Sequence, residues 1–301
     1  MTFARDYRKY LEPETVSRLS RLDLIARLVV EGFITGLHRS PYHGFSVEFS
    51  EYRPYMPGDS TRLIDWKVYG RSDRYYVKRF EEETNLKAYL LVDASGSMGY
   101  ASGKTTKLQY AVYLAAALSY LMLTQRDAVG LATFDSRIRR FLPPRSVLSY
   151  LSVLLRELDN LSGAGDTNLA ETCHNLAERI KRRGLIILFS DLFDDPDRLL
   201  GALKHFRHKK HEVIVFHVLD PMEIRFDFKG DTLFVDLESG SSVQTEPWQV
   251  REGYRNLMQG FMDRYRRECL KNRIDYVPVS TDQPFSNVLF RYLSKRSRLG
   301  G

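Results

Sequence analysis

Short apolar runs alternate with helical patterns along this chain from about residue 86 onward, and this alternation limits the folds it can adopt. The runs are almost continuously apolar and lie at 88–93, 128–134, 185–190, 213–219 and 274–279. Apolar residues recur at helical spacing at 106–124, 147–161, 168–182, 196–207, 249–272 and 285–293. Strands that are covered on both faces need continuous apolar runs. The pattern therefore predicts the α/β class, with an open, mostly parallel sheet and helices on both of its faces.

Two shorter signals concern the ends of these elements. The run 138–142 is followed by Pro143 and Pro144, which indicates a short edge strand. Gly184 follows the helical pattern at 168–182, and we expect it to cap that helix.

The first buried run ends in the turn Asp93-Ala94-Ser95-Gly96-Ser97. Ligands of open α/β sheets bind beyond the carboxyl ends of the strands, which is where this turn is expected to lie. It carries one carboxylate and two hydroxyls at alternate positions, and such oxygen ligands suit a hard divalent cation. Because most of these ligands are neutral, the cation would stay electron-poor and would need another ligand. The turn therefore points to a metal-dependent docking site, although a turn of this kind also occurs simply as a polar cap of the following helix.

Two further loops supply ligands of the same kind. Thr167 lies in the loop 163–168 at the start of a predicted helix, and Asp191 follows the strand predicted at 185–190. The three loops together offer three hydroxyls and two carboxylates but no His or Cys, which favours Mg²⁺ or Mn²⁺ over zinc. Asp166 is either an outer group of the site or a turn residue.

This set of residues resembles the metal-ion-dependent adhesion site of von Willebrand factor type A domains. That family has an Asp-x-Ser-x-Ser turn, a distant Thr and a distant Asp in this order. The resemblance implies that Ser95, Ser97 and Thr167 coordinate the metal directly, and that Asp93 and Asp191 bind it directly or through waters. It also implies that an acidic side chain of a partner takes the open position, and that residues 86–295 have the fold of the family.

A second resemblance lies upstream of the turn. Residues 53–67 read RPYMPGDSTRLIDWK and are followed by Arg71 and by VKRFEEE at 77–83. Over about residues 48–100 the chain is similar to the signature of a bacterial family, the domain of unknown function 58. The resemblance implies a von Willebrand type A fold and a frequent genomic pairing with MoxR-type AAA+ ATPases. Many members carry N-terminal membrane segments, whereas this chain shows none.

The two ends of the predicted domain differ from its middle. Residues 1–85 are expected to form an N-terminal accessory segment, with helices in 11–37 and strand-like pieces at 46–49 and 75–80. Residues 223–244 interrupt the alternation near the other end. Apolar and polar residues alternate there at 224–228 and 232–237, around Lys229-Gly230-Asp231, which predicts a β-hairpin inserted at the periphery of the sheet.

The formal net charge of +7 includes a basic cluster at 204–211. Such a cluster fits either a nucleic-acid patch or a solvated helix face. We expect the solvated face and no nucleic-acid partner, because the chain has no recognisable nucleic-acid motif.

No stretch predicts a membrane span. The longest apolar-rich run, 108–123, contains polar residues and is shorter than the roughly 20 residues that a span needs. Residues 1–10 are charged and have no apolar region of a signal peptide. Cys173 and Cys269 are far apart in predicted helices and are expected to be reduced. These features predict a cytoplasmic location.

The residues favour a non-enzymatic module that binds an acidic side chain of a partner through the metal, and the family resemblance implies that it works with a MoxR-type AAA+ ATPase. The first alternative is a Mg²⁺-dependent phosphoester hydrolase with Asp93 as nucleophile, but the position two residues later is Ser95, where aspartate-based phosphatases have a second carboxylate. No phosphate-binding loop is present. The second alternative is a structural scaffold with an incidental metal site.

Overall fold

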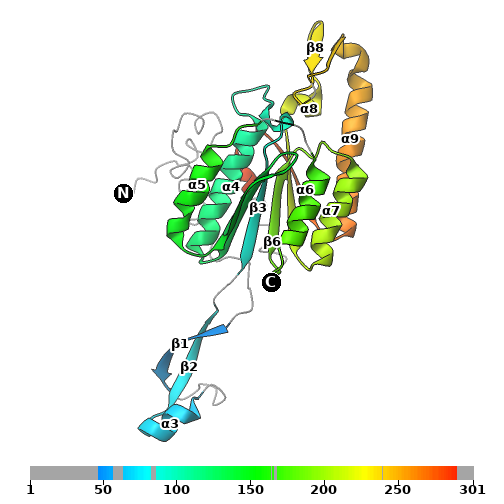
Figure 1. Ribbon diagram of the computed structural model, residues 1–301. Coiled ribbons are helices and arrows are strands. Elements are labelled where there is room, and N and C mark those ends of the chain that lie inside the picture. The colour runs from blue at the N-terminus through cyan, green and yellow to red at the C-terminus, as the bar shows by residue number, and fades with distance from the viewer. Residues whose placement is uncertain are drawn as a thin grey trace, which may run out of the picture. The chain divides into compact units, whose positions relative to one another are not determined.

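The computed structural model describes residues 47–56, 64–82, 86–163, 165, 168–238 and 240–289 of the chain (Figure 1). The described residues fall into two compact units, one within Tyr42–Leu86 and one from Lys87 onward. The helices predicted in 11–37 lie outside the described residues, as do Asp166 and Thr167.

The larger unit is built on a six-stranded sheet. Its strands are β3 (Lys87–Asp93), β4 (Ala128–Phe134), β5 (Ile138–Arg145), β6 (Leu185–Ser190), β7 (Glu212–Leu219) and β10 (Asp275–Ser280). Their order is β10-β7-β6-β3-β4-β5, and every neighbouring pair is parallel except β4 and β5. The predicted α/β class with an open, mostly parallel sheet is confirmed. Both edge strands contain proline, namely Pro143 and Pro144 in β5 and Pro278 in β10.

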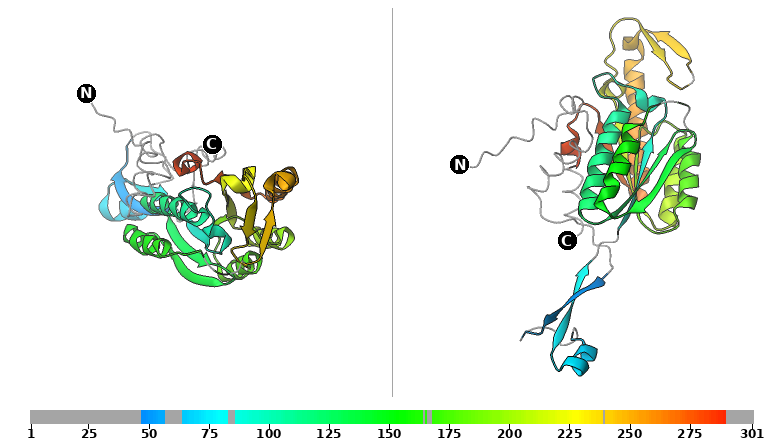
Figure 2. Two further views of the ribbon diagram at one scale, coloured as in Figure 1. Left: turned by 90° about the horizontal axis from the view of Figure 1, so that it is seen from above. Right: turned by 60° about the vertical axis from the view of Figure 1, so that its left-hand side comes forward.

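Helices cover both faces of the sheet (Figures 1 and 2). One face carries α4 (Lys107–Thr124) and α5 (Leu151–Asp159), and the other carries α6 (Leu169–Arg179), α7 (Pro196–His208) and α9 (Pro247–Lys271). α4 is apolar nearly all round, as a helix buried on most of its surface must be. It begins with a capping box: Gln109 N donates to Thr106 Oγ1 at 3.0 Å, and Thr106 N donates to Gln109 Oε1 at 3.1 Å.

The core between the sheet and α6, α7 and α9 is mainly apolar. It includes Leu188 of β6, Phe206 of α7 and Tyr265 of α9, which are all shielded from solvent. Cys173 and Cys269 lie in the same core as free thiols, as expected.

Gly184 has a different role from the predicted one. α6 ends at Arg179 with Ile180 as its C-cap, so Gly184 does not cap the helix. It instead lies against the start of β3, where an added Cβ would be 2.2 Å from the carbonyl oxygen of Lys87. The position needs glycine because the neighbouring atom belongs to backbone that cannot rotate away.

We expect Gly184→Ala to lower the free energy of unfolding by about 1–3 kcal/mol, because the new methyl group must displace a strand. Gly201 of α7 is the matched control, since nothing lies within 4 Å of a Cβ added there. Gly201→Ala should stabilise the protein by roughly 0.5–1 kcal/mol, because glycine in a helix interior is less favourable than alanine by about this amount. Urea denaturation of both variants tests this, and equal effects of the two substitutions would contradict it.

The predicted β-hairpin is present with different strands. Residues 224–228 do not form a strand, because α8 (Pro221–Arg225) begins with a capping box. Met222 N donates to Asp220 Oδ1 and Asp220 N donates to Glu223 Oε2, both at 2.8 Å. The hairpin pairs β8 (Thr232–Val235) with β9 (Ser242–Thr245) in antiparallel register. It projects beyond one end of the sheet, at the top of Figure 1 and of the right-hand view of Figure 2.

The smaller unit contains β1 (Val47–Pro54) paired antiparallel with β2 (Tyr76–Glu82), together with α3 (Trp66–Ser72). Asp65 caps α3, since its Oδ1 accepts a hydrogen bond from Lys67 N at 2.9 Å. The ring of Tyr69 stacks on that of Tyr75, with 4.5 Å between centroids. Trp66 packs edge-on against both rings and keeps 60% of its surface exposed.

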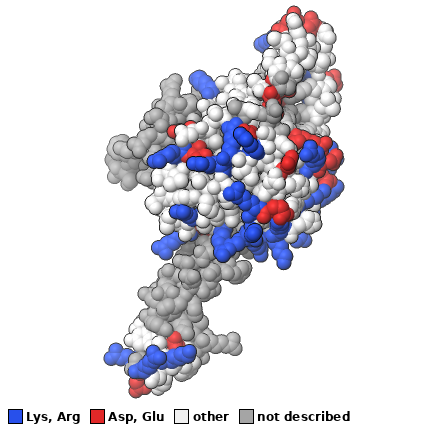
Figure 3. All heavy atoms as spheres, in the orientation of Figure 1, with Lys and Arg blue, Asp and Glu red and all other residues white. Residues whose placement is uncertain are grey.

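The basic cluster at 204–211 contacts groups of its own domain. Lys209 pairs with Glu178 at 2.7 Å and Lys204 with Glu268 at 3.5 Å. The guanidinium of Arg207 donates to the carbonyl oxygens of His211 and Asn272. Figure 3 shows basic and acidic side chains interspersed over this side of the larger unit.

Candidate metal centre

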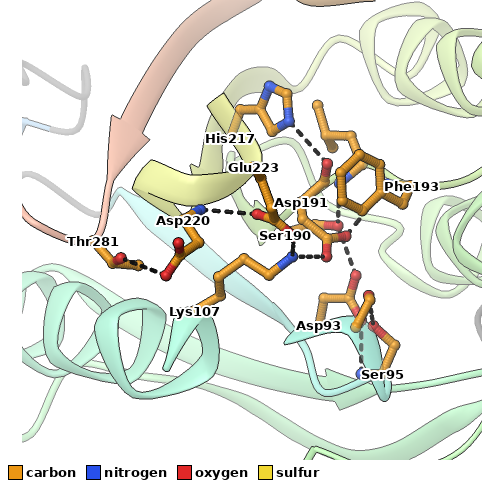
Figure 4. A network of polar contacts seen from close by, with 12 residues as sticks. Asp93, Ser95, Lys107, Ser190, Asp191, Phe193, His217, Asp220, Glu223 and Thr281 are labelled. Carbon is orange, nitrogen blue, oxygen red and sulfur yellow. Dashed lines mark hydrogen bonds and ion pairs between the residues drawn. The ribbon is translucent and has the colours of Figure 1, made fainter. Parts of the chain in front are cut away.

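Asp93 and Asp191 lie at the same edge of the sheet. Asp93 is the last residue of β3, Asp191 follows β6, and these two strands are parallel neighbours. Both carboxylates are buried, with 1% of each residue exposed. The hydroxyl of Ser190 donates to Asp93 Oδ2 at 2.6 Å and so links the two strand ends (Figure 4). The structure therefore brings the two predicted carboxylates together.

The turn after β3 presents its oxygens as the spacing predicts. Ser95 N donates to Asp93 Oδ1 at 3.0 Å, which holds the turn closed. The Oγ atoms of Ser95 and Ser97 are 3.2 Å apart, so both hydroxyls lie on one side of the turn. Ser97 also begins the short 3₁₀ helix η3 (Ser97–Gly99).

The loop that carries Thr167 reaches the same turn. Thr167 lies outside the described residues, but its neighbour Gly165 is described, and Gly96 N donates to Gly165 O at 3.0 Å. Gly165 has a φ of +83°, which favours glycine. Four of the five predicted ligands are thus described and gathered at one place, and the fifth stays a prediction.

The surroundings of Asp93 disfavour the negative charge of its carboxylate. Burial raises the pKa of its carboxyl to about 7, and the charge of Asp191 adds to the effect, while the hydrogen bonds from Ser190 and Ser95 oppose it. Among the described residues, no basic side chain forms an ion pair with Asp93. A buried carboxylate without a nearby counter-charge favours the binding of a cation.

Lys107 is a functional candidate that the sequence reasoning missed. Its Nζ, with the side chain fully buried, lies 2.7 Å from Asp191 Oδ2 and 2.5 Å from Glu223 Oε1 of α8 (Figure 4). Burial alone would lower the pKa of Lys107, but the two carboxylates outweigh it and raise the pKa above its ordinary value. The ammonium also lies over the ring of Phe193, 5.0 Å from its centroid. The available signal was a lysine at the first position of a mostly apolar helix.

His217 of β7 is hydrogen-bonded to the loop that carries Asp191. One ring nitrogen, Nε2, lies 2.8 Å from the carbonyl oxygen of Asp191, and the other, Nδ1, lies 2.6 Å from the hydroxyl of Tyr276. A carbonyl only accepts, so Nε2 is the donor and Nδ1 accepts from the tyrosine. Burial lowers the pKa of His217 to about 4, which keeps the ring neutral. Its role is to orient the Asp191 loop.

The donor set fits Mg²⁺ or Mn²⁺. Mg²⁺ holds octahedral oxygen ligands at about 2.0–2.1 Å, so adjacent ligands are roughly 3 Å apart. The separation of 3.2 Å between the two serine Oγ atoms is close to this value. Among the described residues, no three His, Cys, Asp or Glu side chains gather as a metal cluster, so the hydroxyls are essential to such a site. Hydroxyl and carboxylate oxygens are ligands for hard cations and poor ones for soft metals.

Comparisons with known proteins find a family model and uncharacterized relatives that match this chain. The profile of the family described as "Protein of unknown function DUF58" matches residues 51–261 of this chain. The uncharacterized protein Rv1480 of Mycobacterium tuberculosis is 28% identical over 234 residues, which are 76% of this chain and 73% of that protein.

Two solved structures show more distant likeness. The conserved hypothetical protein BatB from Bacteroides thetaiotaomicron is 19% identical with a TM-score of 0.48, covering 71% of this chain and 99% of that chain. The vWF domain of the type V pili tip protein Mfa5 from Porphyromonas gingivalis is 17% identical with a TM-score of 0.27, covering 34% of this chain and 36% of that chain. Neither likeness is close, so the fold class rests on the strand order given above.

None of the helices in the described part of the chain has the length and apolar character that crossing a membrane requires.

Proposed function

The chain belongs to the family of proteins of unknown function DUF58, and we propose that it is a non-enzymatic module that binds an acidic side chain of a partner protein through Mg²⁺ or Mn²⁺. The observation that carries this proposal is the pairing of a buried carboxylate, Asp93, with two adjacent serine hydroxyls at the carboxyl edge of the sheet. The resemblance to the metal-ion-dependent adhesion site supports the same proposal.

Each residue has a role in the proposed centre. Ser95, Ser97 and Thr167 would hold the metal directly, and Asp93 and Asp191 directly or through water. Lys107 and His217 hold the Asp191 loop through its carboxylate and its carbonyl. When bound, the metal supplies positive charge that neutral hydroxyl ligands leave only partly compensated. A carboxylate from another protein is the natural ligand for that remaining charge.

The contacts of His217 and Lys107 favour docking over hydrolysis. A hydrolase would need a base or a nucleophile free to move a proton at the turn. The ring nitrogens of His217 face the Asp191 carbonyl and Tyr276, and the ammonium of Lys107 is held by two carboxylates. Both groups therefore serve to position the site.

We also propose a MoxR-type AAA+ ATPase as the partner, which the family resemblance suggests. The full chain should bind a purified MoxR-type ATPase from the same genome in the presence of Mg²⁺. Ser95→Ala should weaken this binding at least about tenfold, because it removes a hydroxyl ligand. Surface plasmon resonance with and without chelator measures the effect.

Ser102→Ala is the control for this experiment. Ser102 is exposed and lies in the loop between η3 and α4. Its backbone N–H donates to Asp220 Oδ2 at 2.8 Å, and this contact does not involve the side chain. Its substitution should leave the affinity unchanged. Association that survives an excess of chelator, or that Ser95→Ala leaves intact, would contradict the metal-dependent mechanism.

A further inference from the structure

The turn of the β8–β9 hairpin contacts the candidate metal centre. Ser97 N lies 3.4 Å from Glu238 Oε1, so a carboxylate from residue 238 reaches the backbone of a proposed ligand 141 positions away. Ser97 is the residue whose Oγ lies beside that of Ser95. The contact brings a third acidic side chain of the same chain to the site.

The packing at Gly96 shows that the hairpin turn lies tightly against the turn after β3. A Cβ added at Gly96 would be 2.9 Å from the carbonyl oxygen of Leu237 and 3.2 Å from Cγ of Glu238. The same Cβ would be 3.2 Å from the carbonyl oxygen of Gly165, in the loop that carries Thr167. Only glycine allows the hairpin turn, the Asp93 turn and the Thr167 loop to approach this closely.

The hairpin turn also has a defined conformation of its own. Glu238 N donates to Asp236 Oδ1 at 2.8 Å, and Gly240 N donates to Asp236 O at 2.9 Å. Gly240 has a φ of +69°, which its lack of a side chain allows. These bonds hold Glu238 at the apex of the turn.

Aromatic packing anchors the hairpin to α9. Phe226 stacks on Phe234 of β8, with 5.4 Å between ring centroids, and on Tyr254 of α9, with 4.2 Å. The guanidinium of Arg251 donates to the carbonyl oxygens of Phe226 and Phe228. The hairpin is therefore a tethered arm that keeps its carboxylate near the turn.

We infer that Glu238 is a resident carboxylate ligand of the metal centre, which the partner's acidic side chain must displace. The inference rests on the proposed function. Neutral serine ligands would leave positive charge on a bound cation, and Glu238 is an acidic side chain that the structure places against one of these serines, Ser97. A short tether gives such a group an effective concentration in the millimolar range, so it competes with any free carboxylate. The hairpin thereby lowers the apparent affinity of the site for a partner's carboxylate.

The test uses Mn²⁺ as the probe with the full-length chain. Water-proton relaxation measures how many water molecules the bound Mn²⁺ holds, and acetate titration measures its affinity for a free carboxylate. Glu238→Ala should add one water to the bound Mn²⁺ and should tighten acetate binding roughly tenfold. Glu238→Gln, which keeps the shape without the charge, should change both readouts in the same direction. Asp231→Asn removes a charge from the same hairpin at an exposed position and should change neither.

The outcomes separate this inference from the proposal on which it rests. Wild-type protein that binds no Mn²⁺ would overturn both. Wild-type protein that binds Mn²⁺ with the same water count and acetate affinity as the two Glu238 variants would overturn only the role of Glu238. A change produced equally by Asp231→Asn would also overturn it, since the effect would then reflect net charge alone.

Discussion

Asp93→Asn is expected to reduce the affinity for Mg²⁺ by more than about a hundredfold, beyond the loss caused by removing an outer partner of a metal ligand. Asparagine has the shape of aspartate and keeps an oxygen that can accept from Ser95 N. It removes the charge that a cation needs most, because Asp93 has no basic partner among the described residues. Calorimetric titration of the wild type and the variant with Mg²⁺ measures the difference.

The same substitution should have the opposite effect on the metal-free protein. Burial raises the pKa of Asp93 to about 7, which means that the fold disfavours its ionised form. Metal-free Asp93→Asn protein should therefore be at least as stable as the metal-free wild type. At a Mg²⁺ concentration of about 100 times the wild-type Kd, the wild type should gain roughly 2.7 kcal/mol of stability, and the variant should gain less than about 0.4 kcal/mol.

Asp159→Asn is the control for both measurements, because Asp159 is an exposed residue at the end of α5. It should leave the affinity for Mg²⁺ at the wild-type value. A wild-type affinity in the Asp93→Asn protein would show that the buried carboxylate is not a ligand. A large loss of stability in that variant without metal would show that Asp93 serves the fold itself.

Lys107→Met is expected to lower the free energy of unfolding by about 3–5 kcal/mol, the range for removing one partner of a buried ion pair. Methionine fills a similar volume, so little of the loss comes from packing. The cost arises because Asp191 and Glu223 would keep buried charges without the ammonium 2.7 Å and 2.5 Å away. Urea denaturation at neutral pH measures it.

Two further variants define the origin of that loss. Lys181→Met changes an exposed lysine and should alter stability by less than about 0.5 kcal/mol. Adding Glu223→Gln to Lys107→Met should restore part of the stability, because one of the two carboxylate charges left without the ammonium is then removed. The double-mutant cycle gives the coupling energy. A Lys107→Met protein as stable as the Lys181→Met protein would contradict the buried pair.

The strands of the sheet could be predicted because double burial leaves a continuous apolar run that few other structures need. The segment at 224–228 was predicted wrongly as a strand, because a five-residue alternation is a weak signal. The capping box of Asp220 and Glu223, with Pro221 between them, decides the local structure in favour of a helix. Gly184 was assigned to a helix end, since its close approach to Lys87 depends on a strand distant in the sequence.

The candidate site was predictable where its residues follow strands. Asp93 and Asp191 each end a buried run, and parallel neighbours place such ends together. Lys107 and Glu238 were not predictable in this way. Lys107 meets Asp191 across 84 positions, and Glu238 meets Ser97 across 141. Such pairs depend on how helices and insertions dock on the sheet, which a local pattern does not encode.

The prolines of the two edge strands restrict how this protein can associate with others. Proline has no N–H to donate, so Pro143 and Pro144 in β5 and Pro278 in β10 interrupt the row of donors that an added strand would use. A partner that extended the sheet would meet such a gap at either side. Stacking of copies edge to edge into fibres is hindered for the same reason. Recognition is thereby directed away from the sides of the sheet and towards the loops at its ends.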